Sequence, residues 1–122
     1  MANFDHIYLK VTSLDDAISF YEGIFGKRIT HREGDRWADF DDGTGVYFGI
    51  LNVSIAHEEM LIGNNVMPAL KTEDIEKEHS RIANLHPKSI STISTILQPA
   101  EYKYFEFIDL WGNTWEVAQY NY

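Results

Sequence analysis

The side chains of this sequence that could do chemistry are histidines and acids, because the 122 residues include five histidines, 19 acidic residues and no cysteine. Without cysteine there is no disulfide framework, and no thiolate can bind a metal or take part in redox chemistry. His6 and Glu116 are the pair of most interest, because each lies in a segment with the alternation of a strand. In a dry pocket they could form an ion pair, or they could act on a substrate as an acid and a base, since imidazole titrates near neutrality.

The other four histidines have simpler interpretations. His57 lies beside two glutamates in the link between the two halves of the chain, and could supply a ligand only if that loop folded inward. An exposed loop position is the simpler expectation for it. The remaining histidines are expected at a strand edge, on a helix surface and at a helix end; they are His31, His79 and His86.

The first half of the chain predicts one strand, one helix and three further strands. Residues 4–11 alternate, with His6 and Tyr8 on the same face of a strand. Ser13 with an acidic residue three positions later is typical of a helix start, and Gly26 suits the left-handed conformation at a helix end. Turn residues then separate three strands, which are expected at residues 27–32, 35–40 and 45–53.

The second half repeats this order. A strand at residues 66–72 is followed by a helix near 74–85, which Thr72 or Asp74 could cap. His86-Pro87 ends the helix, because a residue before proline disfavours the helical conformation. Three strands are expected to follow, at residues 89–97, 102–109 and 114–120.

A weak internal repeat connects the two halves. With an offset of 61, Leu9 aligns with Leu70 and Lys10 with Lys71; with an offset of 67, Phe48 aligns with Trp115. Duplication outweighs single local propensities when a fold is predicted. The sequence therefore predicts one α+β domain over residues 1–122, built from two tandem βαβββ modules at about 1–55 and 65–122.

Two segments carry a resemblance to a known family. One holds His6, Phe20-Tyr21 and Phe25-Gly26; the other is residues 107–117, which read Phe-Ile-Asp-Leu-Trp-Gly-Asn-Thr-Trp-Glu-Val. They resemble the vicinal-oxygen-chelate (VOC) superfamily of glyoxalases, bleomycin-resistance proteins and extradiol dioxygenases, whose pattern is Phe-x-Asp-Pro-x-Gly-Asn-x-x-Glu-Leu. Leu110 replaces the proline of that pattern and Val117 its leucine. The resemblance implies a cupped mixed sheet around a cavity, and a homodimer in which the apolar segment 46–53 could be buried.

The metal enzymes of this superfamily take up to four ligands, from the first and fourth strands of each module. The resemblance puts His6 and Glu116 at two of these positions, and the repeat puts Met67 and Gly49 at the other two. A thioether prefers soft metals and glycine offers no ligand. The sequence thus predicts a degenerate metal site and no cofactor. The alternative is a divalent-metal lyase, isomerase or dioxygenase of the glyoxalase type, with Ni, Mn, Fe or Zn held by His6 and Glu116.

Period-two alternation predicts the lining of the cavity that the resemblance implies. Aromatic walls with a few polar groups suit a planar small molecule, and acids among the rings suit a cationic one. The same rings could instead fill the space as ordinary core. Small-molecule binding, such as sequestration, is therefore the favoured function, enzymatic activity stays open, and the ligand-binding candidates are His6, Tyr8, Trp37, Tyr47, Met67, Tyr104, Glu106 and Glu116.

The charge and hydropathy of the chain limit its partners. Ten basic residues against 19 acidic ones give a formal charge of −9, which repels nucleic acid and would mildly favour a cationic ligand. The simpler interpretation is that the surface carboxylates keep the protein soluble. No apolar stretch is long enough to cross a bilayer, and residues 1–6 lack the pattern of a signal peptide. The expected location is the cytoplasm.

Overall fold

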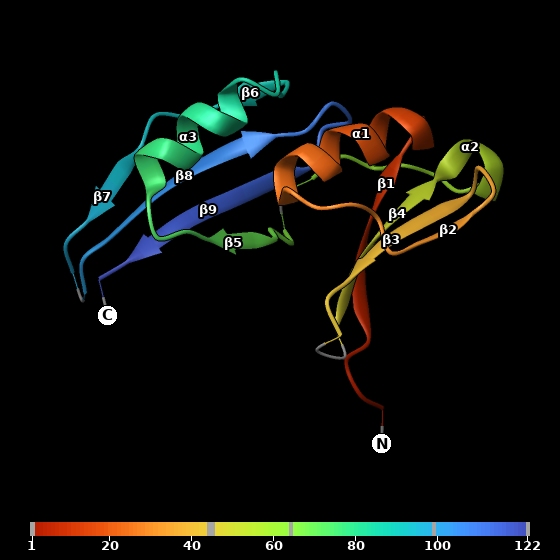
Figure 1. The fold of residues 1–122 in the computed structure, drawn as a ribbon, viewed down its shortest axis with the longest axis horizontal. Helices are drawn as coiled ribbons and strands as arrows, with labels where there is room; N and C mark the ends of the chain where they lie inside the picture. Colours follow the sequence, from red (N-terminus) through yellow and green to blue (C-terminus); the bar gives the residue numbers. More distant parts are fainter. Residues whose placement is uncertain (1, 44–45, 64, 99, 122) are drawn as a thin grey trace. The chain divides into compact units, whose positions relative to one another are not determined.

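The computed structural model describes residues 2–43, 46–63, 65–98 and 100–121, and it divides into two compact units, Met1–Leu61 and Ile62–Tyr122. Figure 1 labels the elements of both units. The predicted α+β architecture is confirmed, with a mixed sheet in each unit. The first unit contains β1 (His6–Val11), α1 (Leu14–Phe25), β2 (His31–Glu33), β3 (Trp37–Asp41), β4 (Tyr47–Asn52) and α2 (Val53–Ala56). The second contains β5 (Ala69–Lys71), α3 (Ile75–Ala83), β6 (Ser89–Ile90), β7 (Ser94–Ile96), β8 (Tyr102–Ile108) and β9 (Thr114–Tyr120).

The first sheet has the strand order β1-β4-β3-β2, with β1 and β4 parallel and the other pairs antiparallel. Helix α1 packs on one face, where Tyr21 is fully buried and its ring lies 5.3 Å from that of Phe48. Strand β4 lies between β1 and β3 (Figure 1), which leaves four of its six residues buried within this unit. Its apolar composition therefore follows from this central position and needs no dimer interface.

The second sheet has the order β5-β9-β8-β6, and β7 also pairs with β8. Its buried face is formed by alternate residues of β8 and β9, as expected from the period of two. Helix α3 is amphipathic and contributes Ile75 and Ile82, both almost completely buried. The sheet residues that complete this core are Phe105, Phe107, Trp115 and Val117.

The two long helices begin with different caps. In α1 the hydroxyl of Ser13 accepts from the backbone N–H of Asp16 at 3.4 Å, as the sequence predicts. In α3 the carboxylate of Asp74 accepts from a backbone N–H of the first turn. The N–H of Ile75, however, donates to the side-chain oxygen of Gln119 on β9, at 2.8 Å. The second helix therefore takes part of its cap from the last strand of the chain.

The motif at residues 107–117 comprises the end of β8, the turn at residues 109–113 and the start of β9. Asp109 is fully buried there, and its carboxylate accepts from the backbone N–H groups of Trp111 and Asn113 and from the Asn113 amide, at 2.8–2.9 Å. Gly112 has a φ of 94°, a conformation that other residues rarely adopt. The Asp, Gly and Asn positions of the motif are thus explained by the turn that they stabilise.

Several strand boundaries differ from the predicted ones. The strand expected at 27–32 begins only at His31, and the one expected at 66–72 covers only Ala69–Lys71, because Pro68 has no N–H to donate. The strand expected at 89–97 is divided into β6 and β7. The strand expected at 45–53 ends at Asn52, whose side chain instead caps the short helix α2, while Gly45 lies outside the described residues.

Among the residues that the structure describes, no helix combines the length and the apolar composition needed to cross a bilayer.

Candidate functional site

Four aromatic side chains gather on the face of the first sheet that is opposite to α1. His6 and Tyr8 come from β1, Trp37 from β3 and Tyr47 from β4, and we call these four residues the aromatic face. The register pairs His6 with Tyr47, and their rings stack at a centroid distance of 4.6 Å. The Trp37 ring lies 5.6 Å from the rings of both His6 and Tyr8, in edge-on geometry. The sheet register therefore brings together residues that are distant in the sequence, the first and last of which, His6 and Tyr47, are 41 positions apart.

Trp37 extends over the neighbouring strand to Gly49. An ideal Cβ atom built on Gly49 would lie 2.2 Å from Cη2 and 2.4 Å from Cζ2 of the indole. The six-membered ring thus fills the space that a side chain at position 49 would need. The other end of the indole is held by Asp39, whose carboxylate accepts from Nε1 at 2.8 Å. The repeat equates position 49 with that of Glu116. The space where a side chain at position 49 would lie is therefore occupied by the indole of Trp37.

A carboxylate also orients His6. Nδ1 of His6 lies 2.6 Å from Oδ2 of Asp5, which leaves Nε2 as the nitrogen that could face a ligand. Burial and then the same Asp5 carboxylate raise the pKa of Tyr47 above its usual value. Asp5 thus interacts with both stacked rings. The sequence offered one signal for this role, since an acid immediately precedes the histidine.

In the second unit three of the four candidate residues, Tyr104, Glu106 and Glu116, lie on the face of the sheet opposite to α3. Glu106 on β8 and Glu116 on β9 are directly opposite each other in the antiparallel register. Burial, and next the charge of Glu106, raise the pKa of Glu116. Tyr104 is two residues from Glu106 on the same strand and lies 5.9 Å from the ring of Tyr102. Met67, half-buried, precedes β5.

The eight sequence candidates therefore fall into two groups, one in each unit. In the first unit the ring of His6 contacts those of Tyr8, Trp37 and Tyr47, whereas the second unit holds the other four candidates. Within the part of the chain that the structure describes, no three His, Cys, Asp or Glu side chains are grouped so that they could hold a metal ion. Asp5, which bonds to His6, and Asp39, which bonds to Trp37, are not among the eight candidates predicted from the sequence.

The other four histidines lie outside the aromatic face, at helix ends, on an edge strand or on α3. His57 ends α2 in the left-handed conformation, with φ 56°. His31 lies on β2, the edge strand of the first sheet. His79 on α3 bonds through Nε2 to the carbonyl of Ser91 and packs against the ring of Phe105. His86, just after α3, has a φ of 56°.

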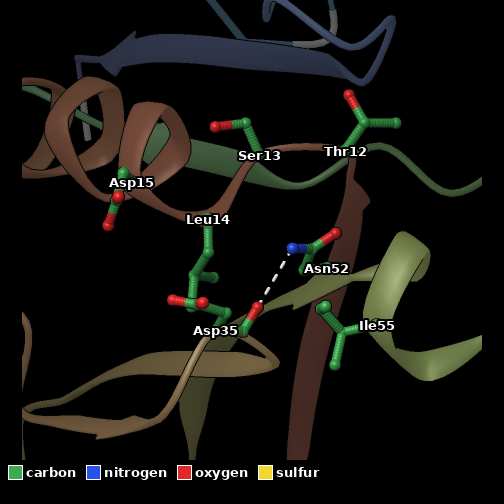
Figure 2. Close-up of a pocket in the computed structure, with 7 residues that line it drawn as sticks. All are labelled: Thr12, Ser13, Leu14, Asp15, Asp35, Asn52 and Ile55. Carbon is green, nitrogen blue, oxygen red and sulfur yellow. Dashed lines mark hydrogen bonds between the residues drawn. The ribbon is translucent and has the colours of Figure 1, made fainter.

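A separate pocket of about 240 Å³ lies at the start of α1. Figure 2 shows its lining, in which the Asn52 amide donates to the backbone carbonyl of Asp35. Both of its carboxylates are already bound, because the guanidinium of Arg32 lies 2.9 Å from Asp15 and 3.0 Å from Asp35. Two of the polar groups that line the pocket are therefore already engaged in ion pairs. The lining residues are Thr12, Ser13, Leu14, Asp15, Asp35, Asn52 and Ile55.

Comparison with solved structures identifies similar folds. TioX from Micromonospora sp. ML1 is 19% identical, with a TM-score of 0.68 and coverage of 98% of this chain and 99% of that one. Lactoylglutathione lyase from Agrobacterium tumefaciens is 16% identical, with a TM-score of 0.69 and coverage of 98% and 94%. A glyoxalase/bleomycin resistance protein from Albidiferax ferrireducens T118 is 14% identical, with a TM-score of 0.71 and coverage of 95% and 97%. At these identities the likeness concerns the fold alone.

Sequence comparison gives the family. No curated protein matches the chain. The family model of the Glyoxalase/Bleomycin resistance protein/Dioxygenase superfamily matches residues 3–117, which is nearly the whole chain. The chain therefore belongs to this superfamily, as its motifs at both ends indicate.

Proposed function

We propose that this protein binds a planar aromatic or cationic small molecule without a metal ion, and that the aromatic face of the first unit makes the main contact. The observation that carries the proposal is the contact of four rings from three strands, with centroid distances of 4.6–5.7 Å. Tyr8 is 41% exposed and the other three rings are half-buried, so the group is open to a ligand in the first unit.

The charges near these rings favour a cation. Asp5 and Asp39 lie beside the aromatic face, bonded to His6 and Trp37. Aromatic faces attract cations through the negative charge above the ring, and nearby carboxylates add to this attraction. The net charge of −9 acts in the same direction at long range. A planar cation would use both the stacking surface and the charge.

The geometry at Gly49 supports a function without a metal. Two of the four ligand positions expected for this superfamily carry Gly49 and Met67. The indole of Trp37 fills the space above Gly49, so that even an introduced ligand side chain would collide with it. Zn²⁺ sites in proteins use at least three protein ligands, and two do not hold such an ion against water.

Binding of defined probes tests the proposal. Proflavine is a planar cation, 2-naphthol is planar and neutral, and choline is a compact cation. We expect proflavine to raise the melting temperature and to bind measurably in a fluorescence titration, because a ligand at 100 times its Kd stabilises by about 2.7 kcal/mol. Trp37→Leu should abolish this binding, whereas Trp111→Leu, which removes an indole from the second unit, should preserve it. Equal binding by both variants would contradict the proposal.

The alternative function is a divalent-metal lyase, isomerase or dioxygenase of the glyoxalase type that uses His6 and Glu116. One contact favours it, because metal-bound histidines usually donate their second N–H to a carboxylate, as His6 does toward Asp5. Titration with Mn, Ni, Fe and Zn, followed by thermal shift and metal analysis, distinguishes the two functions. Stoichiometric binding that is lost in His6→Ala would replace the metal-free proposal with this alternative.

Self-association is a further part of the proposal. VOC domains commonly dimerise, and three apolar side chains close in sequence to the boundary between the units are largely exposed, Leu61 at 81%, Ile62 at 71% and Val66 at 73%. Exposed apolar groups of this kind are typical of contact surfaces. We expect a homodimer in light scattering after size exclusion. A monomer at all concentrations would reject this part and leave ligand binding untouched.

A further inference from the structure

Trp37, the largest ring of the aromatic face, is held at both ends by residues that the ligand itself need not touch. The register pairs Asp39 with Gly49 across β3 and β4, and Trp37 lies two residues before Asp39 on the same face of the sheet. Asp39 binds the five-membered ring of the indole and Gly49 accommodates the six-membered ring. Both ends of the indole are thus fixed by the sheet beneath it.

Gly49 is required by space and not by backbone conformation. The glycines with positive φ are Gly26, Gly34, Gly43 and Gly112, whereas Gly49 lies in the extended backbone of β4. A glycine inside a strand weakens it, and often marks a place where another group approaches closely. Here the approaching group is the indole, at 2.2 Å from the position of an ideal Cβ.

Asp39 is unusual because it is a carboxylate with only 8% exposure. Burial of a charge is costly unless the charge has a partner. The Nε1 atom of Trp37 supplies this partner at 2.8 Å, and a hydrogen bond to a charged acceptor is stronger than one between neutral groups. The indole therefore cannot turn away from Gly49 without leaving a buried carboxylate short of its donor.

We propose that Asp39 is a positioning residue, which together with Gly49 holds the Trp37 indole as a preorganised stacking surface for flat ligands. The inference rests on the proposed binding function and specifies its ligand class as planar. An indole fixed before binding loses little conformational freedom when the ligand arrives. A compact cation gains little from one fixed plane, so flatness matters more than charge for recognition at this face.

Variants of Asp39 test the inference. Asp39→Ala removes the acceptor, Asp39→Asn keeps an acceptor oxygen, and Asp16→Asn is the control, because Asp16 is an exposed acid of α1, which packs on the other face of the sheet. We expect Asp39→Ala to weaken binding of proflavine and 2-naphthol by about three- to tenfold, as one side chain must then be immobilised on binding. Asp39→Asn should restore most of the affinity, the control should match the wild type, and binding of choline should be weak throughout.

The indole N–H signal of Trp37 in a ¹H–¹⁵N spectrum, identified by its loss in Trp37→Phe, separates this inference from the binding proposal. In the wild type we expect one sharp signal shifted by the carboxylate, and in Asp39→Ala a moved or broadened signal. If no probe binds but this signal changes as expected, the binding proposal fails and the positioning of Trp37 stands. An unchanged signal in Asp39→Ala, or equal probe affinity in Asp39→Ala and wild type, would overturn the inference. Preferential binding of choline over 2-naphthol would overturn the ligand class.

Discussion

Replacement of Gly49 by alanine gives the most direct test of the packing beneath the aromatic face. The new Cβ would lie 2.2 Å and 2.4 Å from two carbons of Trp37, well inside van der Waals contact, so either the indole or β4 must move. Overpacking of this kind destabilises the folded state by about 1–3 kcal/mol. Alanine also restricts the backbone of the unfolded chain more than glycine does, which stabilises the protein by about 0.4–1 kcal/mol. We therefore expect Gly49→Ala to reduce the free energy of unfolding by about 1–2 kcal/mol.

The assay is urea unfolding together with a thermal melt. For a chain of 122 residues, a loss of this size corresponds to a decrease in melting temperature of roughly 4–8 °C. Gly63→Ala is the matched control, because nothing lies within 4 Å of a Cβ at Gly63 and its φ is not positive. It should leave stability unchanged or slightly raised.

A double-mutant cycle identifies the clash as the cause. In a Trp37→Leu background the ring carbons are absent, so Gly49→Ala should become neutral or slightly stabilising. The expected coupling energy between the two positions is about 1–3 kcal/mol. The reasoning is refuted if Gly49→Ala costs the same free energy with and without the indole, or if Gly49→Ala is as stable as the wild type.

Two further predictions concern the second unit. Burial and then the charge of Glu106 raise the pKa of Glu116, so the folded chain binds the proton of this carboxyl group more tightly than the unfolded chain does. The stability that this proton contributes is therefore full at acid pH and is lost as the pH rises through the raised pKa. Glu116→Gln should therefore equal the wild type near pH 4 and gain up to about 1 kcal/mol near pH 8 in urea unfolding; a relative loss at the higher pH would contradict this sign. Asp109→Ala removes a fully buried carboxylate that accepts three hydrogen bonds and should cost about 3–5 kcal/mol, while Asp109→Asn should cost less. A loss below about 1 kcal/mol in Asp109→Ala would show that the turn does not depend on these bonds.

The features that the sequence predicted well depend on local signals. Ser13 and Gly26 mark the ends of α1 because capping involves neighbours along the chain. Alternation put His6 and Tyr8 on one face for the same reason, since the period of a strand is fixed by its own backbone. The two long helices, and the strands before and after them, followed from such signals, whereas the short helix α2 was not predicted.

The features that the sequence left open depend on register between strands. The collision of Trp37 with position 49 exists only because β3 and β4 pair Asp39 with Gly49, and no local pattern fixes that pairing. The break between β6 and β7 likewise reflects how each short strand pairs with β8. Propensity alone, with Ile, Ser and Thr throughout residues 89–97, predicts one continuous strand.

The cap that Gln119 provides for α3 has a consequence for the order of folding. In the first unit, every strand and the cap of α1 are present once the chain has been synthesised to Asn52. In the second unit, β5 pairs with β9, and the N–H of Ile75 at the start of α3 donates to Gln119 on β9. The first strand and the helix of this unit therefore lack these partners until β9 has been synthesised. Domains synthesised first generally fold first. We therefore expect the N-terminal unit to fold on the ribosome while its partner unit is still incomplete, and a chain that ends before β9 to keep only the first unit folded.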